Sequence, residues 1–148
     1  MTPDVNVLVA AYRADHPHHR IARLWIERAV ANAESGIPLV MLPMVLSGFV
    51  RLVTNPRVFE HPDSAKNALA FTRSLLEAPG VELATLGKEW SIFESLCLEH
   101  QLTGNAIPDA WIAASTLHLG EHLVSFDKGF RKWLGPGRLT VLEPEKTE

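Results

Sequence analysis

The chain has 148 residues, of which 47% are hydrophobic and 21% charged, and its net charge at pH 7 is -3. This length and composition are typical of one globular domain, 1–148, and they exclude a largely disordered chain. The acidic balance argues against nonspecific binding of DNA or RNA, but a nuclease whose acidic site is filled by cations would have the same balance.

The first half of the chain alternates short apolar runs with longer helical periods. The run Val5–Val9 predicts a short buried strand. A helix follows, with apolar residues recurring at helical spacing from Ile21 to Ala29. The run Pro38–Leu42 predicts a second strand. Pro43 suits the first turn of a further helix, which ends near Asn55–Pro56.

The second half continues the alternation. Asp63 or Ser64 is expected to cap a helix whose inward positions include Leu69, and Pro79–Gly80 ends it. The polar end, Glu143–Glu148, is expected to fray. Between them, the predicted elements are a strand at Val81–Leu86, a helix around Trp90–Cys97, a helix from Pro108 to Leu119, a strand at Leu123–Phe126 and a last strand at Leu139–Leu142.

Strands that alternate with helices predict an α/β sandwich with a mostly parallel sheet. In such folds, ligands bind beyond the carboxyl ends of the strands. Three aspartates are therefore of interest. Asp4 lies at the first predicted strand, and Asp127 directly follows the predicted strand that ends at Phe126. Asp109 lies in the first turn of a helix and shares a face with small and apolar residues such as Ala113.

Each aspartate also has a structural interpretation. Asp109 would complement its helix dipole, Asp127 would be a turn residue, and Asp4 would be a strand-end acid. Together they indicate a site, because clustered carboxylates resist ionising unless a cation joins them, and hard oxygen ligands suit Mg²⁺ or Mn²⁺. Asn6 and Ser125 stand beside these acids and would orient a carboxylate or bond to the backbone.

Four sequence blocks, in a rather specific order and separation, carry a family resemblance over nearly the whole chain. The pattern they form resembles the PIN-domain ribonucleases, and specifically the VapC-type toxins. This resemblance implies an α/β, PIN-like three-layer sandwich, with a mostly parallel twisted sheet and helices on both faces. The blocks are Asp4-Val5-Asn6-Val7-Leu8, Leu46 to Arg57, Thr103 to Ala110, and Ser125 to Phe130.

The resemblance also implies an activity, a metal and partners. The activity is endoribonuclease cleavage of RNA by metal-activated water, dependent on Mg²⁺ or Mn²⁺, with 5′-phosphate products. Asp4, Asp109 and Asp127 match three acidic positions of the family and are expected to be catalytic and to bind the metal. Where many members carry Glu, this chain has Gly48, as in a subgroup with a Gly-Phe-x-Arg pattern. The implied partners are RNA, a VapB-type antitoxin and a second copy of the chain in a homodimer.

Phosphate contacts need cations. Arg51, Arg57, Lys128 and Arg131 lie near the blocks that carry the resemblance and are candidates for binding RNA. For most of these side chains, a role in solubility is favoured.

The tryptophans have two interpretations, because they could also stack on bases. Core packing is favoured for Trp25 and Trp90, which recur with other apolar residues. Trp111 lies off the face of Asp109 and is a candidate for an interface.

Two other function classes remain open. One is a non-catalytic PIN-fold module that binds RNA or protein and has lost full metal binding, as Gly48 would indicate. The other is a phosphoacceptor receiver domain, which also clusters acids at strand ends. The run Val81–Leu86 ends without an aspartate, and this argues against a receiver domain.

The cellular setting is predicted from what the sequence contains. Cys97 is the only cysteine, so no internal disulfide can form, which is typical of a reducing compartment. No positively charged segment followed by an apolar run opens the chain, and no apolar stretch is long enough to cross a membrane. We therefore expect a cytoplasmic protein without a signal peptide.

Overall fold

The structure is a computed structural model that describes residues 1–144. Most of the tail that is predicted to fray, residues 145–148, lies outside the described residues. No helix among residues 1–144 has the length and apolarity needed to span a bilayer. The helices of the described chain are α1 (Val5–Tyr12), α2 (His19–Glu34), α3 (Pro43–Val53), α4 (Ala65–Glu77), α5 (Trp90–Glu99), α6 (Ala106–Leu119) and the short 3-10 helix η1 (Lys128–Lys132).

All strand pairs are parallel, as predicted. β1 pairs with β4 and β4 with β5, while β2 pairs with β3. The amide of Val40 in β2 donates to the carbonyl of Met1, which precedes β1, at 2.9 Å. This bond joins the β2-β3 pair to the three strands β1, β4 and β5, so the strand order is β3-β2-β1-β4-β5. Within the described chain, the strands are β1 (Thr2–Pro3), β2 (Leu39–Met41), β3 (Val81–Leu83), β4 (Leu123–Ser125) and β5 (Leu139–Val141).

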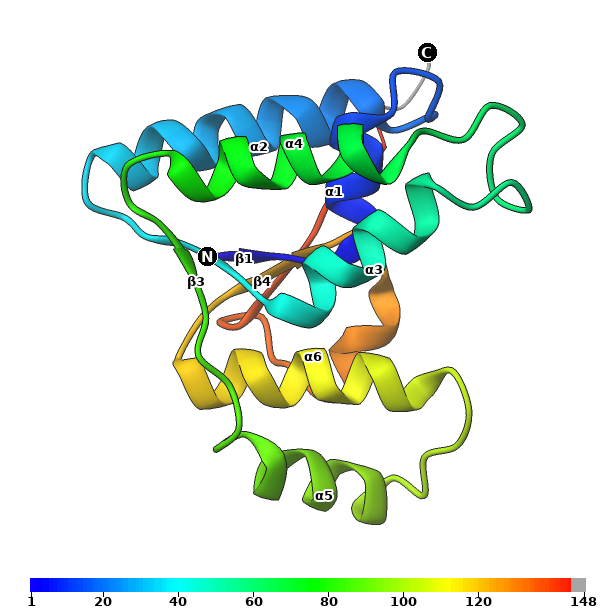
Figure 1. Cartoon of the computed structure of the whole chain (residues 1–148). Coiled ribbons are helices and arrows are strands. Elements are labelled where there is room, and N and C mark those ends of the chain that lie inside the picture. The colour runs from blue at the N-terminus through cyan, green and yellow to red at the C-terminus, as the bar shows by residue number, and fades with distance from the viewer. Residues whose placement is uncertain (145–148) are drawn as a thin grey trace.

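Helices cover both faces of the strands. α2 and α4 lie on one side, and α6 lies on the other with α5 outside it (Figure 1). α1 packs against α2 and α3. These layers confirm the predicted α/β sandwich.

The predicted strand at Val5–Val9 is wrong, because this segment is helix α1. Asp4 caps the helix, and its carboxylate accepts a hydrogen bond from the Val5 amide at 2.7 Å. The residues Val7–Ala11 are all buried, so the helix has no polar face from which a helical period could be recognised. The strand precedes it and is only two residues long.

Local signals at other helix ends give the predicted boundaries. Pro43 occupies the start of α3, and the Ser64 hydroxyl caps α4 by accepting from the Asn67 amide at 3.1 Å. Gly120 ends α6 with a left-handed φ of 66°, which glycine adopts without a Cβ penalty. Leu69 was expected to point inward, and this prediction is wrong, since it is half exposed.

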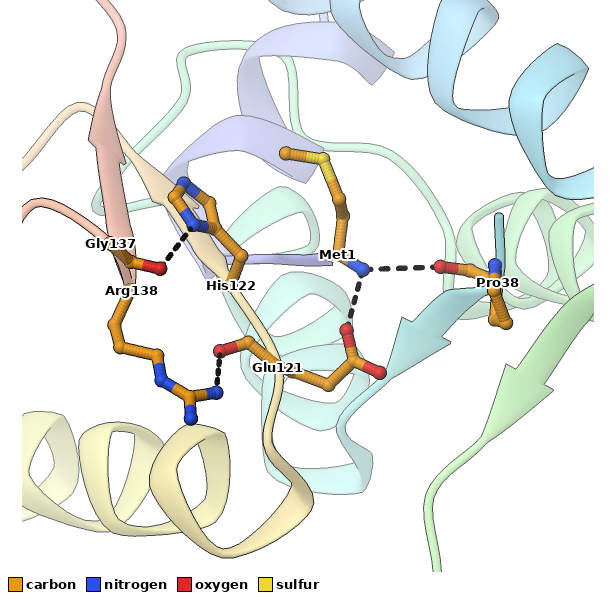
Figure 2. A network of polar contacts seen from close by, with 6 residues as sticks. All are labelled: Met1, Pro38, Glu121, His122, Gly137 and Arg138. Carbon is orange, nitrogen blue, oxygen red and sulfur yellow. Dashed lines mark hydrogen bonds and ion pairs between the residues drawn. The ribbon is translucent and has the colours of Figure 1, made fainter. Parts of the chain in front are cut away.

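Polar contacts at the N-terminus hold the short strand β1 in place. The terminal amine of Met1 donates to the Pro38 carbonyl at 3.1 Å and to Glu121 Oε2 at 2.6 Å (Figure 2). The Arg138 guanidinium donates to the Glu121 carbonyl at 3.2 Å. These bonds connect the segments before β2, β4 and β5. They therefore fix the strand from which Asp4 emerges.

Candidate active site

The order of the strands leaves a crevice between β1 and β4. The chain runs from β1 outward to β2 and β3, and then returns to the other side of β1 to form β4 and β5. A ligand site is expected at such a reversal, beyond the carboxyl ends of the strands. Asp4 follows β1 directly and Asp127 follows β4 after one residue, so the fold brings both acids to this edge.

A cavity of about 630 Å³ opens at this edge of the sheet. Asp4, Asp109 and Asp127 all line it, together with Asn6 and Gly48. Its walls come from the start of α1, from α3, and from the α5 and α6 pair. The three predicted acids therefore converge on one cavity, although Asp4 and Asp109 lie 105 positions apart in the sequence.

Asp4 is the most buried of the three acids, with 5% of the residue exposed. Its Oδ1 accepts from the Val5 amide and its Oδ2 from the Ser125 hydroxyl, both at 2.7 Å. Burial raises the pKa of this carboxyl to about 6, although the two hydrogen bonds lower it, and the negative charges of Asp109 and Asp127 raise it further.

Ser125 and Asn6 form the polar framework around this carboxylate. Besides its bond to Asp4, the Ser125 hydroxyl accepts from the Asp127 amide at 2.9 Å. The Asn6 amide group donates to the same hydroxyl at 3.3 Å, and its oxygen accepts from the Phe126 amide at 3.3 Å. Ser125 therefore orients the carboxylate of Asp4 directly, and Asn6 acts on it through Ser125.

Asp109 and Asp127 occupy different environments. Asp109 is half-buried in the first turn of α6, and burial raises its pKa, as does the charge of Asp127, while Lys132 lowers it. Its carboxylate accepts no hydrogen bond from the described residues. Asp127 is exposed, and its Oδ1 accepts from the Gly129 amide at 2.7 Å at the start of η1. Asp127 is thus a turn residue and also lines the cavity.

The negative charges of Asp109 and Asp127 raise the pKa of Asp4, and that of Asp127 raises the pKa of Asp109, because like charges repel. Within residues 1–144, no three His, Cys, Asp or Glu side chains form a ready-made cage for a metal ion. A cation at this edge would therefore take only part of its shell from carboxylates, with water or substrate oxygens completing it. Asp4 and Asp109 present carboxylates suited to that task.

Helix α3 contributes Gly48 and Arg51 to the cavity instead of an acid. A Cβ at position 48 would lie 3.1 Å from Val5 Cγ2, which is tighter than ordinary contact. Gly48 therefore allows α3 to approach α1 closely. Arg51 is exposed and lines the same cavity, so α3 adds a positive charge to its wall.

The other predicted cations lie outside the lining of the cavity. Arg57, Lys128 and Arg131 are exposed and do not line the cavity. Lys132 was not among the leading candidates for RNA binding, but its charge acts on Asp109.

Aromatic residues from α5 and α6 line part of the same cavity. Trp90 is 54% exposed and lines the cavity with Phe93, so its predicted place in the core is wrong. Trp25 packs against the core, as expected. Trp111 also lines the cavity, and its Nε1 donates to Glu89 Oε1 at 2.9 Å. Sequence reasoning missed Glu89, because nothing in Gly-Lys-Glu-Trp distinguishes a buried glutamate from an exposed one.

Comparison with known proteins agrees with this geometry. A model of the PIN domain family matches residues 1–133. Ribonuclease VapC31 of Mycobacterium tuberculosis is 36% identical over 133 residues, covering 88% of this chain and 90% of the relative. Ribonuclease VapC25 of the same species is 35% identical over 131 residues, with the same coverage. VapC ribonuclease Mb2897 of Mycobacterium bovis is 39% identical over 131 residues, covering 88% of this chain and 87% of the relative.

These matches span nearly all of the chain that carries the cavity and its acids. These matches exclude the alternative of a receiver domain. With the layered parallel sheet and the acids at its carboxyl edge, they establish that the chain belongs to the PIN domain family.

Proposed function

We propose that this chain is an endoribonuclease that depends on Mg²⁺ or Mn²⁺ and acts as the toxin of a type II toxin–antitoxin module. The observation that carries the proposal is the convergence of Asp4, Asp109 and Asp127 on one cavity. The relatives named VapC ribonucleases support the reaction class. The substrate bond is a phosphodiester of RNA, cut by water.

The donor set fits a hard divalent cation. Carboxylate oxygens are the ligands that Mg²⁺ and Mn²⁺ prefer, and repulsion among these acids is relieved by positive charge. Asp4 and Asp109 would be direct ligands, and Asp127 would bind directly or through water. When bound, such a cation supplies an activated water and stabilises negative charge developing on the phosphodiester.

The chain's own residues prepare this site. The Val5 amide and the Ser125 hydroxyl hold the carboxylate of Asp4 in one orientation. Because its pKa is raised to about 6, Asp4 must lose a proton before it binds a cation. Arg51, on the cavity wall, is placed to contact a phosphate of the RNA. The acids would act on the scissile phosphate through the cation that they hold, and Arg51 would contact it directly.

A cleavage assay tests this proposal. RNA is incubated with the protein in EDTA, Mg²⁺ or Mn²⁺, and the product ends are mapped. We expect cleavage only with a divalent cation, 5′-phosphate products, and loss of cleavage in Asp4→Asn and Asp109→Asn. The matched control is Glu77→Gln, which alters an exposed acid at the end of α4 and should cut at the wild-type rate.

The alternative function predicts different results. A non-catalytic module would bind RNA or protein without cutting RNA in any of these cations. The lack of an acid at Gly48 is the observation that favours it. Cleavage at equal rates in the parent and in both aspartate variants would instead show that the wrong residues have been assigned.

We also infer partners and location that follow from the toxin proposal. A VapB-type antitoxin would bind the protein and suppress cleavage, two copies would form a homodimer, and both would act in the cytoplasm. Purification with and without a co-expressed antitoxin, followed by light scattering and the cleavage assay, tests the two associations. A monomer whose activity no antitoxin changes would contradict them.

A further inference from the structure

We propose that the aromatic wall of the cavity, formed by Trp90, Phe93 and Trp111, receives an unpaired nucleobase next to the phosphodiester bond that is cut. This inference rests on the proposed ribonuclease function and names the residues that would hold a base of the substrate. The aromatic residues come from α5 and α6, and the acids at the sheet edge share the same cavity.

Trp90 offers its ring surface to a ligand. More than half of the residue is exposed, and its ring packs on Phe93 with 4.9 Å between centroids. The indole N–H already donates to Glu94 Oε1 at 3.0 Å. The polar group of Trp90 is therefore satisfied within α5, and what remains available in the cavity is a π surface.

Trp111 is held in place by a buried acid that the proposed chemistry does not use. Glu89 is only 2% exposed, and its two oxygens accept from Trp111 Nε1 at 2.9 Å and from the Gly87 amide at 2.5 Å. Burial raises the pKa of Glu89, but these hydrogen bonds outweigh it and leave the pKa below its ordinary value. Glu89 thus fixes the indole before any ligand arrives, which lowers the entropy lost on binding.

A nucleobase suits this wall better than a protein side chain does. Every base has a π face, and stacking on aromatic residues is how proteins hold unpaired bases without reading their sequence. Arg51, and a cation held by the acids of the same cavity, would hold the adjoining phosphate. A base within a duplex is covered on both faces by its neighbours, so the site selects single-stranded or looped RNA.

The test combines a protein variant with a substrate variant. Single-stranded RNA that contains the mapped cleavage site is prepared, and each nucleotide beside the scissile bond is replaced in turn by an abasic one. We expect one position at which the abasic substrate loses roughly fivefold to 150-fold in kcat/KM, mainly through KM. Trp90→Ala should lose a similar factor on the normal substrate, with no further loss on the abasic one.

Two further variants complete the design. Trp111→Phe keeps a ring but removes the bond to Glu89, and it should weaken the same preference for a base. Trp25→Phe alters a tryptophan outside the cavity and should match the wild type in the cleavage of every substrate. Thermal unfolding of each variant confirms that it is folded.

The outcomes separate the two proposals. If the wild-type protein cuts RNA but neither Trp90→Ala nor any abasic position slows it, the nucleobase site is refuted while the ribonuclease proposal stands. The nucleobase site would also be refuted if Trp90→Ala and the abasic substrate each lowered kcat/KM by factors that multiply when the two are combined. The Trp90 ring and the base would then not contact each other. If the wild-type protein cuts no RNA with either cation, the proposed function itself fails.

Discussion

The buried charge of Asp4 lowers the unfolding free energy of the protein, and Asp4→Asn measures by how much. The residue is 5% exposed, and its carboxyl has a pKa of about 6 against an ordinary value of 3.8. At about pH 8, this difference corresponds to about 3 kcal/mol of lost unfolding free energy. Asparagine keeps the cap to the Val5 amide and has no charge. We expect Asp4→Asn to raise the unfolding free energy of the metal-free protein by about 1 to 3 kcal/mol.

The sign of the pH dependence follows from the direction of the pKa shift. Because folding raises the pKa of Asp4, the contribution of this group to the unfolding free energy is fully present below pH 3.8. This contribution is lost as the pH rises through about 6. The advantage of Asp4→Asn should therefore be absent at the acidic end and grow across this interval. Urea unfolding of both proteins in EDTA over a pH series measures it. A variant that is less stable at alkaline pH, or a gain independent of pH, would refute the reasoning.

Three further substitutions probe the site and the sheet. Ser125→Ala removes the hydroxyl that donates to Asp4, and the pKa of Asp4 should therefore rise. The acidic limb of the cleavage pH–rate profile should move to higher pH, and an unmoved limb would contradict this. Gly48→Ala crowds Val5 but gains about 1 kcal/mol of helix propensity, so the unfolding free energy measured in urea should change by less than about 1 kcal/mol. A loss of unfolding free energy above about 3 kcal/mol would show that α1 and α3 cannot adjust to the added methyl group. Glu121→Gln removes a partly exposed ion pair to the N-terminal amine and should lower the unfolding free energy, measured by thermal unfolding, by about 0.5 to 1 kcal/mol. An unfolding free energy equal to that of the wild type in both high and low salt would show that the pair contributes nothing.

Features of the fold that depend on local chemistry could be predicted from the sequence. Pro43 begins a helix because its fixed φ suits the first turn, Ser64 caps one with its hydroxyl, and Gly120 ends one with a positive φ. The place of Asp127 followed from the rule that ligand sites lie at the carboxyl ends of parallel strands.

Other features depend on what packs around a residue, and the sequence does not display this. Helix α1 resembles a strand because it is buried on all sides, so its apolar run has no periodic polar face. Trp90 has the spacing of a core residue, yet α5 packs on α6 at the outside of the molecule (Figure 1). More than half of Trp90 is therefore exposed. The buried Glu89 accepts a hydrogen bond from Trp111, which lies 22 residues away in the chain.

Binding of Mn²⁺, followed through the electron paramagnetic resonance signal of the free ion, tests most directly whether the acids share a cation. We predict that the wild-type protein and Glu77→Gln remove Mn²⁺ from solution, and that Asp4→Asn and Asp109→Asn each bind it far more weakly. Equal binding by all four proteins would contradict the assignment of the cation to the cavity that Asp4, Asp109 and Asp127 line.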